Sequence, residues 1–165
     1  LGSATLGLEI SDSINDLDIA ILPVGGGGLI AGAATALKLK NPKLTIFGIE
    51  PMGADSMKRS FEESRPVTLE KVNTIADSLG APMAMKYSYE LTRKSVDKIF
   101  TVSDEDLKNA MRFIQTYLNL WVEPACAASM AGLRGPLKEY CEGKNVAIIA
   151  CGSNISFKKF SEILD

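Results

Sequence analysis

The chain has 165 residues, of which 46% are apolar and 23% are charged. This length is typical of one domain, and this composition is typical of a chain that folds around an apolar core. Eighteen basic against twenty acidic side chains leave a formal net charge of -2, which argues against a protein that binds the phosphate backbone of nucleic acids. The sequence therefore predicts one folded domain without a nucleic-acid partner.

The sequence contains no histidine. Serine–histidine triads, HExxH zinc sites and histidine proton relays all need an imidazole, so these residues cannot build any of them. Chemistry in this chain must use other side chains or a bound cofactor.

The three cysteines, Cys126, Cys141 and Cys151, are an odd number without a CxxC spacing. Such cysteines are typical of reduced thiols in the cytosol rather than of a disulfide framework. No apolar run reaches the roughly 18 residues of a membrane span. We therefore expect a cytoplasmic protein without a membrane partner.

Short apolar segments alternate with helical patterns along the chain. Residues 18–24 (DIAILPV), 44–49 (LTIFGI) and 99–102 predict strands, and the small and apolar residues 29–40 predict a helix between the first two. Residues 145–150 (NVAIIA) are almost continuously apolar, as central parallel strands are. The alternation predicts an α/β fold: an open, twisted, mostly parallel sheet with helices on both faces.

Two further segments complete this description. Ser103 and Asp106 form a near capping box, which predicts the start of a helix directly after the third strand. The apolar side chains of this helix lie on one face, at Leu107, Met111, Ile114 and Leu118. Residues 52–83 hold several Pro, Gly and Ser, and we expect surface loops around a short helix there.

Four glycines, Gly25 to Gly28, lie between the first predicted strand and the following helix. A glycine backbone lets an anion approach, and the free amides and dipole of the helix start attract it. Ligands of parallel sheets bind at the carboxyl ends of the strands, where this turn lies. We interpret the run as a phosphate-binding turn, with a merely flexible turn as the alternative.

The glycines alone leave the kind of phosphate open. Gly26, Gly28 and Ala31 satisfy GxGxxA, and Glu50 ends the next strand about 20 residues later, where dinucleotide-binding folds place a ribose-binding acid. No Lys-Ser/Thr pair follows the glycines, which excludes a nucleoside-triphosphate P-loop. A dinucleotide-binding domain therefore stays as one alternative.

Five segments in order resemble a known family. They are residues 25–32 (GGGGLIAG), 50–51 (EP), 74–77 (TIAD), 122–125 (VEPA) and 151–154 (CGSN). Together they resemble the carboxyl-terminal half of fold-type II pyridoxal-phosphate enzymes, in the serine/threonine dehydratase family that includes serine racemase. The opening residues 2–10 (GSATLGLEI) resemble the family segment GQGTIGLEI, with Ser3 and Ala4 in place of Gln and Gly.

The resemblance implies roles for particular residues. The amides of Gly25, Gly26, Gly27 and Gly28 would hold the cofactor phosphate, with Leu29 opening the helix. Cys151 matches the Ser or Cys that faces the pyridine nitrogen, and a neutral thiol there would favour elimination of a β-hydroxyl; a small buried thiol is the alternative. Asp77 and Glu123 would hold loops near the cofactor, or be ordinary surface carboxylates.

A cation site is also implied. Glu50 and Ala54 match a carboxylate and a carbonyl of the site found in some members, but Ser56 stands where racemase-like members have a second carboxylate, which weakens divalent binding. Other members hold a monovalent ion with carbonyls, for which the matching positions are Gly25, Ala54, Leu79 and Ala81. The alternative for Glu50 is a helix-capping or hydrogen-bonding acid.

The family motif that carries the Schiff-base lysine, Ser-x-Lys-x-Arg-Gly, does not occur in residues 1–165. Ser56-Met57-Lys58 and Ser156-Phe157-Lys158 lack the Arg-Gly that should follow. The chain also begins at Leu1 rather than Met. We therefore expect residues 1–165 to be the carboxyl-terminal part of the cofactor-binding large domain, inactive alone, with the missing amino-terminal half as its partner.

For the complete enzyme, the resemblance implies pyridoxal 5'-phosphate-dependent β-elimination of ammonia from L-threonine or L-serine, a small amino-acid substrate, to a 2-oxo acid, in a homo-oligomer. Three alternatives stay open: a serine or aspartate racemase, a non-catalytic subunit with this fold, and the dinucleotide-binding domain.

Overall fold

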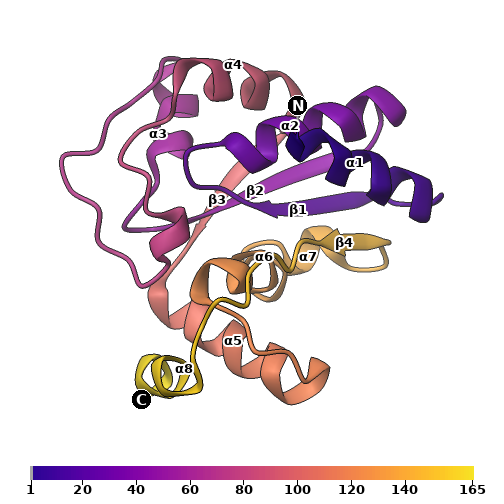
Figure 1. The fold of residues 1–165 in the computed structure, drawn as a ribbon. Helices are drawn as coiled ribbons and strands as arrows, with labels where there is room; N and C mark the ends of the chain where they lie inside the picture. Colours follow the sequence, from indigo (N-terminus) through magenta and orange to yellow (C-terminus); the bar gives the residue numbers. More distant parts are fainter. Residues whose placement is uncertain (1) are drawn as a thin grey trace.

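A computed structural model describes residues 2–165. Four strands form one sheet in the order β3-β2-β1-β4, and every neighbouring pair is parallel (Figure 1). The strands are β1 (Ile19–Pro23), β2 (Thr45–Pro51), β3 (Lys98–Val102) and β4 (Val146–Ile148). The predicted parallel sheet is confirmed.

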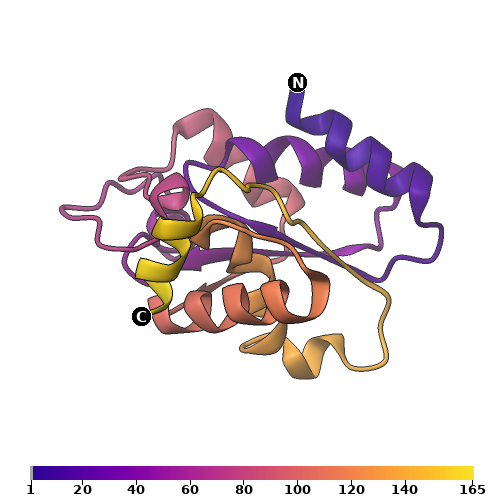
Figure 2. The ribbon, with the colours of Figure 1, turned by 60° about the horizontal axis from the view of Figure 1, so that its bottom comes forward.

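Helices cover both faces of this sheet. They are α1 (Gly2–Ser13), α2 (Gly28–Lys40), α3 (Ser56–Glu63), α4 (Lys86–Ser95), α5 (Asp104–Leu118), α6 (Pro124–Arg134), α7 (Lys138–Cys141) and α8 (Phe157–Leu164), with a 3-10 turn η1 (Asp77–Leu79). In Figures 1 and 2, α1 and α2 lie on one side of the strands, and α5 and α6 lie on the other. The predicted three-layer α/β arrangement is confirmed.

Alternate side chains of the central strands enter two separate cores. On β1, Ile19 and Ile21 belong to the core beneath α5 and α6, whereas Ala20 and Leu22 belong to the core beneath α2 and α4. All five residues of β1 are buried. This double burial explains why the strand is an unbroken apolar run in the sequence.

The position of β4 differs from the prediction. We expected a central strand, but β4 pairs only with β1 and forms an edge of the sheet within residues 2–165, and its three residues are half-buried. An apolar run indicates that both faces of a strand are covered by other elements. It does not indicate whether neighbouring strands pair with both of its edges, so the sequence could not predict the position of β4 in the strand order.

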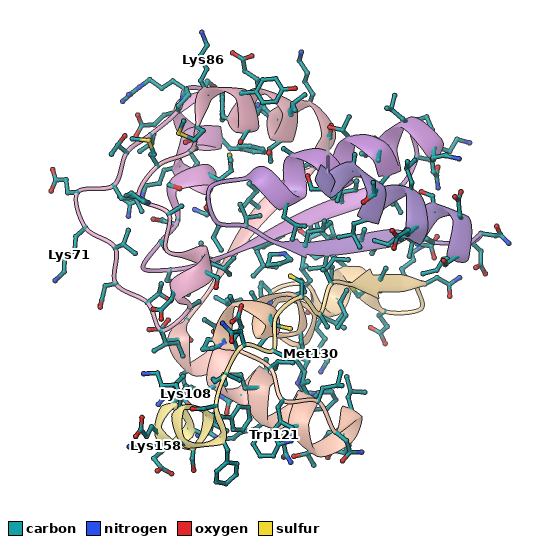
Figure 3. All side chains as sticks on the ribbon, viewed as in Figure 1. Lys71, Lys86, Lys108, Trp121, Met130 and Lys158 are labelled. Atoms are coloured by element: carbon teal, nitrogen blue, oxygen red, sulfur yellow. The ribbon has the colours of Figure 1, made fainter. Side chains whose placement is uncertain are left out.

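The segment between β2 and α4 is mostly irregular, as expected. Its regular parts are α3, η1 and an isolated bridge between Thr68 and Met83. Figure 3 shows Lys71 extending from this loop away from the sheet. The carboxyl-terminal helix α8 lies beside α5, and its Phe157 and Phe160 pack against Trp121, which follows α5.

All three cysteines are free thiols, as the sequence predicts, with Cys126 and Cys141 buried and Cys151 exposed. In the part of the chain described here, no helix has both the length and the apolar character needed to cross a membrane.

The capping box at the start of α5 is present. The Ser103 hydroxyl accepts the Asp106 N–H at 3.1 Å, and the Asp106 carboxylate accepts the Ser103 N–H at 2.9 Å. Ser103→Ala should lower the free energy of unfolding by about 1 kcal/mol in urea titrations, because the hydroxyl that accepts the Asp106 N–H is lost. Ser103→Thr keeps the hydroxyl and should lose less than half of that; equal losses for Ala and Thr would contradict the capping role.

Candidate cofactor-binding site

The tetraglycine turn connects β1 to α2, and its conformation leaves amides free. Gly27 has φ 85°, a left-handed conformation that favours glycine, and α2 begins at Gly28 without a side-chain cap. Ala31 is the first residue whose N–H reaches back, to the Gly27 carbonyl at 2.9 Å. The amides of Gly28, Leu29 and Ile30 therefore have no acceptor within the helix, and they face outward at its positive end.

The turn is packed against other side chains at Gly27 and is open at Gly28. A Cβ at Gly27 would lie 2.5 Å from Met57 Cε, whereas a Cβ at Gly28 would meet no atom within 4 Å. On the α1 side, the Ser3 hydroxyl donates to the Gly28 carbonyl at 2.9 Å. The space in front of the free amides can thus accept an anionic group such as a phosphate, and the packing behind holds the amides in place.

A pocket of about 250 Å³ lies in front of this turn. It brings together segments that are far apart in the chain: the turn itself, the η1 segment, the start of α6 and the loop that follows the last strand. The predicted site residues in its lining are Gly25, Gly26, Gly27, Gly28, Leu29, Glu123 and Cys151. Ser78 and Leu79 line it as well, and its described lining includes no lysine.

Cys151 lies at the carboxyl end of the sheet, three residues beyond β4. Its side chain keeps solvent contact, yet the surrounding protein raises the pKa of the thiol, chiefly by desolvation and in part through the Glu123 carboxylate. The thiol is therefore neutral at pH 7. A neutral thiol can donate a weak hydrogen bond to a ring nitrogen but cannot balance a positive charge there.

Two loops meet at Glu123. The Ser78 hydroxyl donates to Glu123 Oε1 at 3.2 Å, and the Glu123 N–H donates to the Gly152 carbonyl at 3.2 Å. Asp77 is exposed beside Ser78 in η1. The sequence did not single out Ser78, although it directly follows the Thr74–Asp77 segment and could have been considered on that ground.

Glu50 has a different environment from the one a ribose contact needs. It is fully buried, and its two carboxylate oxygens accept the amides of Met57 at 2.9 Å and Lys58 at 2.8 Å, at the start of α3. Burial raises the pKa of Glu50 to about 8, against the lowering effect of these two hydrogen bonds. The ribose-binding role considered for Glu50 is therefore wrong, and its helix-capping alternative describes its contacts.

The positions considered for a cation fall into two groups. In the first group, the Glu50 carboxylate accepts amides of α3, and Ala54 is buried and donates its N–H to the Pro51 carbonyl. The second group consists of carbonyl positions in the glycine turn and near η1, and these lie close together. A Cβ at Gly25 would lie 3.1 Å from Leu79 Cα, and one at Gly26 would lie 3.6 Å from Ala81 Cβ. Within residues 2–165, no three His, Cys, Asp or Glu side chains are grouped as a metal site.

Comparison with known proteins agrees with this geometry. The family described as pyridoxal-phosphate dependent enzyme matches residues 1–152. The chain belongs to this family. One relative, phenylserine dehydratase from Ralstonia pickettii, is 48% identical over 164 residues, which cover 99% of this chain and 50% of that protein.

Solved structures of this kind have the same fold. The processed form of threonine deaminase isoform 2 from Solanum lycopersicum superposes with a TM-score of 0.93 at 32% identity, covering 98% of this chain and 48% of that one. Maize serine racemase superposes with a TM-score of 0.91 at 31% identity, covering 98% and 51%. The resemblance to the dehydratases and racemases is thus confirmed, and the chain spans about half the length of the curated relatives it matches.

Proposed function

We propose that this chain forms the phosphate-binding half of a pyridoxal-phosphate-dependent ammonia-lyase. The observation that carries the proposal is the pocket that is lined both by the start of α2, with its free amides, and by a neutral thiol, Cys151. The enzyme would remove ammonia and the β-hydroxyl from a β-hydroxy amino acid and leave a 2-oxo acid. The dehydratases among the relatives support this reaction.

The residues present fit the cofactor. When bound, pyridoxal phosphate supplies the electron-withdrawing group that makes loss of the Cα proton and then of the β-hydroxyl possible. The amides of Gly28 and Leu29 would bind its phosphate, supported by Gly25, Gly26 and Gly27. Cys151 would donate a hydrogen bond at the ring nitrogen, while remaining uncharged.

The base of the reaction is proposed to come from outside residues 1–165. We infer that the complete protein contributes an amino-terminal half with the lysine that binds the cofactor and removes the Cα proton, and that residues 1–165 are the carboxyl-terminal part of the large domain. The coverage of about half of each relative supports this division. We further propose a homo-oligomer in the cytoplasm, a compartment that suits the three free thiols.

The substrate is proposed to be L-threonine or L-serine, and the phenylserine dehydratase adds a β-aryl amino acid as a candidate. The complete protein should be incubated with L-threonine, L-serine and L-threo-phenylserine. We expect visible cofactor absorbance and equal amounts of ammonia and 2-oxo acid from at least one of them. A pure protein that binds no pyridoxal phosphate would contradict the proposal.

A racemase is the second candidate, because maize serine racemase shares the fold. Chiral chromatography of the same reactions separates the two activities. A lyase consumes the amino acid without accumulating its enantiomer, whereas a racemase forms the enantiomer without ammonia. Cofactor binding without either product would instead indicate the non-catalytic subunit.

For a cation, the carbonyl positions Gly25, Leu79 and Ala81 are better supported than the Glu50 position, since both Glu50 oxygens already accept amides. We propose a monovalent ion there. Exchange of potassium for tetramethylammonium should then lower activity, whereas a chelator of divalent ions should not.

A further inference from the structure

Among the described residues that line the cofactor pocket, Glu123 is the one with a charged side chain. It is the N-cap residue of α6, but its carboxylate does not cap that helix. The side chain is half-buried and is therefore held between other elements rather than extended into solvent. Its contacts indicate what it does instead.

The carboxylate contacts two walls of the pocket. On one wall it accepts the Ser78 hydroxyl at 3.2 Å. On the other it lies directly against Gly152, whose φ of 133° and lack of a side chain leave room for it. The backbone of Glu123 adds a second link to this wall, since its N–H donates to the Gly152 carbonyl.

Neither wall belongs to a long regular element. Ser78 lies in the three-residue turn η1, and residues 151–156 have no regular secondary structure. The segments are more than 70 residues apart in the sequence, so their separation across the pocket depends on tertiary contacts. Glu123 contacts both segments.

Charge effects agree with this position. Burial, together with smaller effects of the nearby Cys151 and of the Glu123 carboxylate, raises the pKa of Cys126 to about 12. Glu123 acts in the same direction on Cys151. The carboxylate is thus close enough to both thiols to favour their neutral forms.

We propose that Glu123 is a positioning residue of the cofactor pocket, which holds Ser78 and the Cys151–Gly152 turn at the separation that admits the cofactor ring. The inference rests on the proposed function, because it assumes that this pocket binds pyridoxal phosphate. It adds a role for Ser78, whose hydroxyl is oriented by Glu123 at the pocket wall.

The test measures cofactor binding to the complete protein by absorbance and fluorescence titration with pyridoxal phosphate. Glu123→Ala removes both contacts of the side chain and should weaken binding at least about tenfold, since a hydrogen bond to a charged group is lost at a site that must be pre-arranged. The fluorescence anisotropy of the bound cofactor should also fall, because the ring gains freedom. Glu123→Gln keeps an acceptor of the same shape and should recover most of both losses.

Two further variants separate positioning from general stabilisation. Ser78→Ala removes one wall contact and should give an intermediate affinity, whereas Glu90→Ala, an exposed acid on α4, should match the wild type. If Glu123→Ala lowers only the unfolding free energy of the cofactor-free protein, and leaves both the affinity for the cofactor and the anisotropy of the bound cofactor at the wild-type values, the inference is overturned. A wild-type protein that does not bind the cofactor would instead overturn the proposed function.

Discussion

Replacing Gly28 with Asp is expected to weaken cofactor binding at least about 100-fold without unfolding the protein. Gly28 is the first residue of α2, and a Cβ added there would meet no atom within 4 Å. A carboxylate at this position would itself interact with the free amides and repel the phosphate. The same carboxylate suits the positive end of the helix and should stabilise it by about 0.5 kcal/mol.

Gly28→Asn is the matched control, because it adds a side chain of the same size without the charge. Its affinity for pyridoxal phosphate, measured by equilibrium titration of the complete protein, should fall less than about tenfold. Equal affinities for the Asp and Asn variants would show that the phosphate does not bind at this helix end.

The second large effect concerns stability and Glu50. Burial raises the pKa of Glu50 to about 8 in the folded protein, from an ordinary value of 4.5. The folded state therefore holds the proton more tightly than the unfolded state does. Its contribution to stability is fully present below pH 4.5 and is lost as pH rises through about 8. The free energy of unfolding should fall across this window, by on the order of 4 kcal/mol from this one group.

The measurement is urea unfolding of the wild type and of Glu50→Gln at several pH values between 5 and 9. Gln does not titrate, so the stability of the wild type relative to this variant should decrease as pH rises. Glu62→Gln, at an exposed position of α3, should leave the pH dependence unchanged. Parallel curves for wild type and Glu50→Gln would contradict the buried-acid description of Glu50.

Much of the fold could be predicted from local patterns. The β1 strand, the turn and α2 follow from an apolar run, four glycines and a helical segment, and α5 follows from Ser103 and its capping box. Helix α6 could not be predicted in this way, because nine of its eleven residues are buried and most of them are small or apolar. Its sequence therefore lacks the alternation of apolar and polar faces that identifies an amphipathic helix. The edge position of β4 depends on pairing, which hydrophobicity does not encode.

The candidate site divides in the same way. The free amides at Gly28 and Leu29 could be predicted from the glycine run, because their chemistry is a property of the local backbone. The burial of Glu50 could not, since it depends on where α3 returns against β2 in the tertiary structure. The contact between Glu123 and Ser78 likewise joins residues 45 positions apart, and no local sequence pattern predicts it.

A crystal structure of the complete protein with pyridoxal phosphate would test the central claim most directly. The account predicts phosphate oxygens within hydrogen-bonding distance of the Gly28 and Leu29 backbone nitrogens, with the ring directed toward Cys151. Density for the phosphate elsewhere, with the space in front of Gly28 filled by solvent, would contradict it.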